Sequence, residues 1–488
     1  MSNPQQVGAV NQTQQNQPTA QTNQNNPVDD AVETISNKLD DSGWFDDVTH
    51  EELNEISEVL ENLSPADTNE VISRLSDDQL AKFSGEMNSN APFGLGGLNG
   101  NEKNTLFTNL ARDLDGEQLA RLAVNFTDRG DIERLGTAIA EHASPTAKVD
   151  FIEQLANPSA EYLTDDATHR PFTLGASITE HGDPHALAVG EVLASLSNNQ
   201  GALREAYNHL SDSQLDAVFS AAMDKASYAT QGGFTVSFDP EQLVNIIEAA
   251  ATSSNPELKA RVFEAGARQL NAIRDTDSVI VNPLADEDAA PVTEALTALI
   301  KSDTVGVVNV LETQDRYGDA LVTFNEELIR SGQEDVVGEI IADLQTDNGN
   351  TLDPLAYMEQ PDRPTGDPHY GNAQNLGYYS GSVQAAIDNI TSDAQEQARF
   401  IGNIFSTTFS AVGKVGPTPF KIGTAVATGL TREIINAVVS DIKAGHQSMQ
   451  DAFYELAFPR DPGSNQPYEG AAEPAYDSSS SRVILAHQ

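Results

Sequence analysis

Two clusters of histidine and acidic residues are the best candidates in the sequence for metal or acid–base chemistry. His181 and His185 flank Asp183, which brings two imidazoles and a carboxylate into one short stretch. Imidazole nitrogens and carboxylate oxygens are donors that zinc accepts. Asp183 also stands directly before Pro184, and this order is typical of a helix start in which the Asp caps the first turn. We therefore expect a capped helix at this position and no metal site.

The second cluster combines one histidine with four carboxylates. Its members are Asp46, Asp47, His50, Glu51 and Glu52. Carboxylates gather at helix N-termini because the helix dipole favours negative charge there, so the cluster indicates a helix start and a solvated face. The run from Asp113 to Gly116 begins like a calcium loop but lacks the third ligand position.

Familiar catalytic motifs are absent from the sequence. It contains no Gly-x-Ser-x-Gly, no His-Glu-x-x-His and no phosphate-binding loop, since Gly413-Lys414 is followed by Val415 and lacks the earlier glycine. The chain has no cysteine, which excludes disulfides and thiolate chemistry. We expect no catalytic, cofactor-binding or metal-binding residue and no cofactor. An enzyme whose site is assembled from scattered Asp, Glu and His residues remains an alternative.

The elements that carry these residues are predicted to be short helices with recurring start signals. Four Ser or Asp residues each stand three positions before a Gln that is followed at once by Leu, as in a capping box. They are Ser76, Asp115, Ser211 and Asp239. Four more starts place Pro at the first helical position. They are Ser64-Pro65, Ser144-Pro145, Asp183-Pro184 and Asn255-Pro256.

Apolar residues between these starts recur at helical spacing, as Leu106, Leu110 and Leu114 show. Each such stripe needs neighbouring helices to cover it. The sequence therefore predicts an all-α fold, an irregular helical array that is solenoid-like or a bundle. The alternating segment 234–238 and the β-branched segment 279–281 predict at most one minor β ribbon.

Composition divides the chain into six predicted parts. Residues 1–28 are a Gln/Asn-rich leader that we expect to be disordered, 29–270 form the capped short-helix array, and 271–345 add further helices. Residues 346–375 are rich in Pro, Gly and Asp and predict a linker. Residues 376–458 predict an amphipathic helical hairpin, and 459–488 predict a disordered tail.

The predicted hairpin consists of two long helices joined by a Pro/Gly turn, and its charge differs from the rest of the chain. No Asp or Glu occurs from Gln397 through Arg432. A locally basic, apolar tip could contact an anionic bilayer or another protein. The residues that we assign to this candidate membrane or assembly hairpin are Ile401, Phe405, Phe409, Lys414, Pro417, Pro419, Lys421 and Leu430. A buried helical pair packed against the array is the alternative.

Charge limits the partners of this protein. The chain has 74 acidic and 27 basic residues, which gives a formal charge of −47. Such a surface repels phosphate, so we expect no nucleic-acid binding. We expect a protein partner or self-association, and possible contact with a membrane surface. A saline habitat would also account for the acidity.

The layout resembles secreted effector or toxin-type proteins of Gram-negative bacteria. The resemblance is carried by the polar leader, by the segment from Leu376 to Ile387 and by the hairpin after it. It implies a non-enzymatic exported protein that acts through protein–protein contacts, with the hairpin used for assembly or membrane contact. The alternative is a pore-forming or membrane-perturbing toxin acting through residues 397–432. Because the first Lys is Lys38, the expected route is secretion without a cleaved leader, and otherwise the protein is cytoplasmic.

Overall fold

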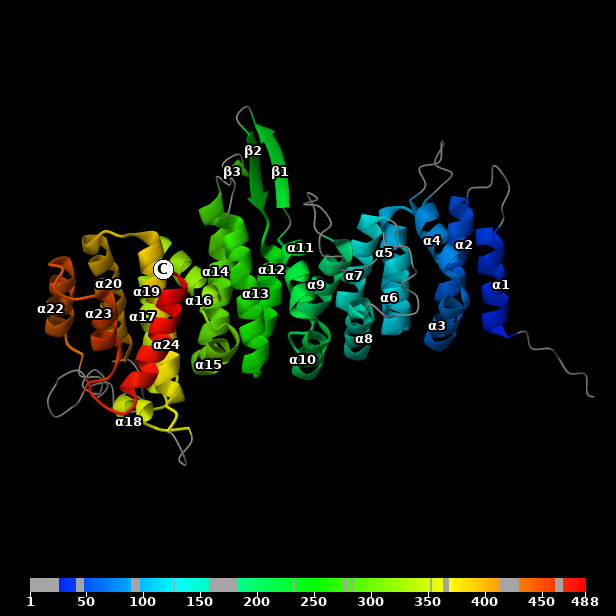
Figure 1. Ribbon diagram of the computed structural model, residues 1–488. Coiled ribbons are helices and arrows are strands. Elements are labelled where there is room, and N and C mark those ends of the chain that lie inside the picture. Colours follow the sequence, from blue (N-terminus) through cyan, green and yellow to red (C-terminus); the bar gives the residue numbers. More distant parts are fainter. Residues whose placement is uncertain are drawn as a thin grey trace, which may run out of the picture.

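The chain forms an extended array of short helices stacked in two layers (Figure 1). The computed structural model describes residues 26–40, 48–88, 97–126, 128–157, 183–223, 225–230, 233–274, 280–281, 284–351, 353–362, 368–412, 430–460 and 468–488. The predicted all-α class is confirmed. The leader 1–28 lies almost entirely outside the described residues, because they begin at Asn26.

The amino-terminal half contains α1 to α13. Their bounds are α1 (Pro27–Asp40), α2 (His50–Glu61), α3 (Pro65–Arg74), α4 (Asp77–Met87), α5 (Gly100–Asp113), α6 (Gly116–Asn125), α7 (Arg129–His142), α8 (Pro145–Ala156), α9 (Pro184–Ser195), α10 (Gln200–His209), α11 (Asp212–Ala221), α12 (Glu241–Ala251) and α13 (Pro256–Arg274).

The carboxyl-terminal half contains the remaining helices. They are α14 (Ala285–Lys301), α15 (Thr304–Gln314), α16 (Asp319–Arg330), α17 (Glu334–Thr346), α18 (Pro354–Met358), α19 (Gly371–Ile390), α20 (Ala394–Val412), α22 (Arg432–Lys443), α23 (Met449–Ala457) and α24 (Glu473–Ala486).

Helices alternate between the two layers along most of the chain. In one layer α5 packs on α7, α7 on α9, α9 on α12 and α12 on α14. In the other layer α4 packs on α6, α6 on α8 and α8 on α10. The apolar stripes meet between the layers and form one continuous core, in which Leu106, Leu110 and Leu119 are buried. Stacking of this kind covers each amphipathic helix with its neighbours.

The predicted helix starts are largely confirmed. Ser76 and Ser211 each form a complete capping box with the Gln three residues later. Asp115 accepts a bond of 2.9 Å from the amide of Gln118 without the reciprocal side-chain bond. The prediction was wrong in part at Asp239, because Gln242 donates instead to the Leu187 carbonyl of the neighbouring helix α9 at 3.1 Å. A tertiary contact has replaced the local one.

A small β ribbon stands out from the helical layers (Figure 1). Strands β1 (Lys225–Thr230) and β2 (Gly233–Phe238) pair antiparallel along their whole length, and β3 (Ile280–Val281) joins β2 in parallel. The segments 234–238 and 279–281 were predicted as strands, and the structure places residues 280–281 beside β2. The sequence prediction missed β1, whose Lys-Ala-Ser-Tyr-Ala-Thr sequence alternates only weakly.

The predicted two-helix hairpin at 376–458 is wrong in its connectivity, because the segment forms α19, α20, α22 and α23. The first long stripe breaks after α19, where Thr391 is extended and Asp393 accepts bonds from the amides of Gln395 and Glu396 at 2.9 and 3.0 Å. The second breaks at Gly445, whose φ is +70°. Local cap and turn residues therefore override a continuous apolar stripe. The predicted Pro/Gly turn lies outside the described residues.

Two segments predicted to lack structure contain helices. The predicted linker 346–375 includes α18, and the predicted disordered tail 459–488 contains α24, which packs along α19. No apolar stripe predicts α24, because its run Ser478–Ser481 is polar, yet Ser479 and Ser480 are buried. Close contact with glycines of α19 makes this burial possible, since Cβ atoms at Gly377 and Gly381 would lie 2.2 Å from the Tyr476 carbonyl oxygen and 2.7 Å from that of Ser480.

Candidate functional site

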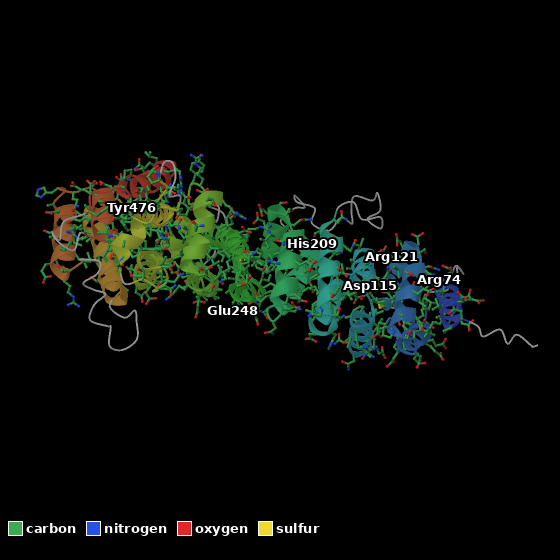
Figure 2. All side chains as sticks on the ribbon, turned by 90° about the horizontal axis from the view of Figure 1, so that it is seen from below. Arg74, Asp115, Arg121, His209, Glu248 and Tyr476 are labelled. Carbon is green, nitrogen blue, oxygen red and sulfur yellow. The ribbon has the colours of Figure 1, made fainter. Side chains whose placement is uncertain are left out.

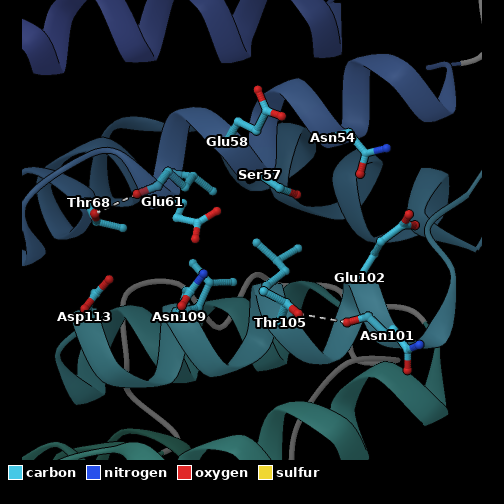
Figure 3. Close-up of a pocket in the computed structure, with 13 residues that line it drawn as sticks. Asn54, Ser57, Glu58, Glu61, Thr68, Asn101, Glu102, Thr105, Asn109 and Asp113 are labelled. Carbon is cyan, nitrogen blue, oxygen red and sulfur yellow. Dashed lines mark hydrogen bonds between the residues drawn. The ribbon is translucent and has the colours of Figure 1, made fainter.

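A groove lies between α2 and α5, with Thr68 of α3 at one end. Its volume is about 370 Å³. Both helices begin with complete capping boxes, formed by Thr49 with Glu52 and by Asn99 with Glu102. These boxes fix where the two helices start and hence which side chains face each other across the groove (Figure 3). The volume falls within the range of small-ligand pockets and is also sufficient for a few side chains of a partner.

The groove combines an apolar floor with an acidic, polar rim. Leu60, Leu106 and Leu110 line it and are nearly fully buried. The rim carries carboxylates from both helices, and the amides and hydroxyls there add further hydrogen-bonding groups. The lining carboxylates are Glu58, Glu61, Glu102 and Asp113. None of the thirteen lining residues is Lys or Arg. Asp113 is already paired with Arg112 at 2.8 Å, and Glu102 closes the capping box of α5. Glu58 and Glu61 are therefore the carboxylates that a cationic side chain with an apolar stem would meet.

His50 lies beside this groove and belongs to the acidic cluster singled out in the sequence. Its Nδ1 lies 2.7 Å from the Gly97 carbonyl oxygen, and its Nε2 lies 2.9 Å from the Asn54 amide and 3.6 Å from a carboxylate oxygen of Glu102. Glu52 accepts from the Thr49 backbone amide, and this bond lowers the pKa of the Glu52 carboxyl. The predicted helix start is therefore confirmed, while Asp46 and Asp47 lie outside the described residues.

A second acidic groove, of about 740 Å³, lies over α7, α9 and α12, which continue the layer of α5. Its carboxylates are Glu133, Glu141, Glu191, Asp239 and Glu241. Arg129, its one basic lining residue, contacts Glu133 at 2.6 Å. Burial raises the pKa of Glu191, although Thr137 donates to it at 2.9 Å. The same layer of helices thus carries two carboxylate-lined grooves.

Two arginines bind carbonyl and carboxylate oxygens of neighbouring helices. Arg121 of α6 donates to the Ile72 carbonyl at 3.0 Å and contacts the Asp77 carboxylate at 2.8 Å at the turn between α3 and α4 (Figure 2). Arg261 of α13 makes the equivalent contacts at the turn between α10 and α11, with the Leu210 carbonyl at 2.8 Å and Asp212 at 2.9 Å. The excess of carboxylates on the surface follows from the 74 acidic and 27 basic residues of the chain.

The histidine pair considered as a metal site is not assembled in the part of the chain that the structure describes. His185 is buried, with Nε2 at 3.0 Å from the Ala123 carbonyl oxygen and Nδ1 at 3.1 Å from Asp183. Asp183 also accepts the His185 amide at 2.8 Å, so the predicted cap on α9 is confirmed. His181 lies outside the described residues. Within the described ranges no group of three His, Cys, Asp or Glu residues is placed to hold a metal ion.

The residues assigned to the candidate membrane or assembly hairpin divide into two sets. Ile401, Phe405 and Leu430 are buried in the core, where Phe405 meets Phe453 edge to face at 5.4 Å. α20 approaches α17 so closely that a Cβ at Gly338 would lie 2.4 Å from the Ile404 carbonyl oxygen. Ile401 and Phe405 therefore cannot reach a bilayer or a partner while α20 is docked. The side chains of Phe409, Lys414, Pro417, Pro419 and Lys421 lie outside the described part of the chain.

No described helix combines the length and the hydropathy needed to cross a membrane.

The sequence interpretation missed both grooves because they arise from the spacing between helices far apart in the chain. One local signal was present. Asn54, Ser57, Glu58 and Glu61 follow one another at helical spacing and form a polar stripe on α2. A stripe of this kind is usually a solvated face, so only the position of α5 shows that it borders a concave site.

The fold defines an all-α protein built as a stacked helical array, and comparison with known proteins adds no family to this class. No family model and no curated protein matches the chain. Among solved structures, an engineered protein is 13% identical, with 88% of this chain and 99% of that chain covered and a TM-score of 0.23. This score is too low to support an argument on fold or function.

Proposed function

We propose that this protein is a non-enzymatic binding protein whose helical array holds a basic segment of a protein partner in the groove between α2 and α5. The observation that carries the proposal is the combination of a leucine floor with the exposed carboxylates of Glu58 and Glu61 and no Lys or Arg in the lining. An amphipathic partner segment would place lysine or arginine heads at the rim and their aliphatic stems over the groove, where Leu60, Leu106 and Leu110 expose only a small part of their surface.

The polar ends of the array favour binding of a partner along its side. The outermost helices α1 and α22 lie at opposite ends (Figure 1). Each buries one stripe and exposes polar residues on its outer face, for example Asp30 and Glu33 on α1 and Glu433 and Asn436 on α22. Terminal helices with polar outer faces close a stacked array. The grooves in the layer of α5, α7, α9 and α12 are then the natural contact sites.

We further propose that the protein is an exported effector of bacterial origin. The support is the uncharged Gln/Asn-rich leader and the helical body without a catalytic motif. A secretion assay that detects the full chain, but not a chain lacking residues 1–25, outside the cell would support export. Equal amounts of both outside the cell would contradict a role for the leader.

The groove is tested with an amphipathic peptide that carries leucine on one face and lysine on the other. We expect it to bind the full chain, and we expect the double change Glu58→Gln and Glu61→Gln to weaken binding about three- to tenfold, as the loss of two partly exposed ion pairs implies. Because these contacts are electrostatic, added salt should reduce wild-type binding more than binding to the variant. Fluorescence anisotropy across a salt series measures both effects.

A matched control replaces two exposed carboxylates outside the groove, Glu248 and Glu294, by Gln. This control has the same net charge as the groove variant. If both double variants weaken peptide binding equally, binding depends on overall charge and the groove is not the binding site.

A further inference from the structure

The β ribbon is anchored at its base and stands free of the helices at its other end. The Asp239 amide donates to the Met223 carbonyl at 3.1 Å, and the Phe238 amide donates to the Asp288 carboxylate of α14 at 3.1 Å. Figure 1 shows β1 and β2 extending beyond the helical layers from this base. The anchor fixes the direction of the ribbon, so its strands are presented in one orientation.

β1 is the terminal strand of the sheet. The strand order is β1-β2-β3, and within the described residues no strand pairs with the outer side of β1. In an antiparallel ladder alternate residues direct their N–H and C=O groups away from the partner strand. The Phe238 amide donates to Asp288 and therefore points away from β1, so Phe238 and its partner Lys225 form a pair that is not hydrogen-bonded across the ladder. By this alternation the backbone groups of Lys225, Ser227 and Ala229 point outward.

The charge of the ribbon differs from that of the body. From Lys225 through Phe238 there is no Asp or Glu, although the chain has 74 acidic residues among 488. Two copies that each carry a charge of −47 repel one another over most of their surfaces. The ribbon projects from this surface and allows two copies to meet without setting carboxylate against carboxylate.

We infer that β1 pairs with β1 of a second copy, antiparallel about a two-fold axis. Identical edges pair in this way in isologous dimers. A register centred on Ser227 sets Lys225 of one copy opposite Ala229 of the other, so the two lysines are not opposed. The polar outer faces of α1 and α22 do not offer a comparable contact at the ends of the array.

The interface is expected to be weak. A single pair of six-residue strands buries less than the roughly 1,200 Å² at which stable interfaces begin. Repulsion between the acidic bodies weakens it further at low ionic strength, so salt should strengthen the dimer. This salt dependence is opposite to that of peptide binding in the groove, so the two proposals can fail independently.

The test is sedimentation equilibrium of the full chain over a concentration series at low and high salt. We expect a monomer–dimer equilibrium that shifts toward dimer at high salt. Ser227→Pro removes an outward amide from each copy and should weaken the dimer about tenfold or more, since two inter-strand hydrogen bonds are lost. Ser227→Thr keeps the amide and should preserve the dimer. Circular dichroism confirms that each variant retains its helices.

A charge variant tests the register. Ser227→Glu sets two carboxylates opposite each other at the two-fold axis and should weaken the dimer, with partial recovery at high salt. Asn436→Glu adds the same charge on the exposed face of α22 and should leave the dimer unchanged. A chain that remains monomeric at every salt concentration overturns the inference, as does a dimer that Ser227→Pro and Ser227→Glu leave intact.

Discussion

A buried lysine links three helices near the amino-terminal end of the array. Lys103 of α5 lies 3.0 Å from the Asp131 carboxylate of α7, and Asn88 at the end of α4 donates to the same carboxylate at 2.6 Å. Lys103 and Asp131 are 6% and 0% exposed. Removing one member of such a pair leaves a charge buried without its counter-ion. At the residue scale we therefore expect this network to be sensitive to substitution.

Lys103→Met should lower the free energy of unfolding by about 3 kcal/mol, the lower end of the range for breaking a buried pair, because Arg134 lies 3.6 Å from Asp131 and compensates in part. Urea unfolding measures the change. Arg74→Met breaks the exposed pair with Asp29 and should cost less than about 1 kcal/mol. Equal effects of the two substitutions would show that Lys103 and Asp131 are not coupled as a buried pair.

At the scale of elements, glycines allow several pairs of helices to approach each other closely. Gly377 and Gly381 bring α24 onto α19, Gly338 brings α20 onto α17, and Gly136 brings α9 onto α7, where a Cβ would lie 2.8 Å from the Ala188 Cα. Helix pairs that approach backbone to backbone bury short polar side chains such as Ser480 with little apolar area. This arrangement explains how a helix without a strong apolar stripe still docks.

Gly377→Ala should loosen α24, because the new methyl group meets the Tyr476 carbonyl oxygen and the helix must move away. Hydrogen exchange of the α24 amides should become at least about tenfold faster, which corresponds to a cost of about 1.4 kcal/mol. The control is Gly85→Ala in α4, where no atom lies within 4 Å of the new Cβ. It should stabilise its helix by about 0.5–1 kcal/mol. Unchanged exchange in α24 would mean that Gly377 does not control the docking.

Features that depend on local chemistry could be predicted from the sequence. Features that depend on contacts between distant segments could not. The capping boxes at Ser76 and Ser211 and the all-α class follow from residue order within one turn. The break at Thr391 does not follow from residue order, because the apolar stripe continues past it and predicts one long helix. Helix α24 does not follow either, because its polar serine run predicts disorder. The groove of Glu58 and Glu61 depends on how far α2 and α5 stand apart, which no local pattern encodes.

At the scale of the whole molecule, several carboxyl groups have raised pKa values. Burial is the main cause for Glu191, Asp315 and Asp343, so these groups hold protons more strongly in the folded chain than in the unfolded one. A raised folded pKa means that the native state binds more protons as pH falls, so stability rises in that direction. Glu52, whose pKa is lowered, contributes with the opposite sign.

We therefore expect the free energy of unfolding to increase as pH is lowered from neutral through the raised pKa values of these carboxyl groups, because they protonate preferentially in the folded state and the net negative charge declines. Urea unfolding at a series of pH values measures this slope. Glu191→Gln removes one raised group and should increase stability at neutral pH while reducing the slope. A slope of the opposite sign would contradict the expectation.

The docking of α24 on α19 has a consequence for biosynthesis. Stacked helices of the amino-terminal half contact near neighbours in sequence, so they can fold in order as they leave the ribosome. α19 cannot, because the helix that covers Gly377 and Gly381 is made only after α20, α22 and α23. The face of α19 that carries Gly377, Gly381 and Ser380 therefore stays uncovered until α24 has been made. A nascent chain stalled before Glu473 should bind chaperones through this region, whereas its amino-terminal half should already resist proteolysis.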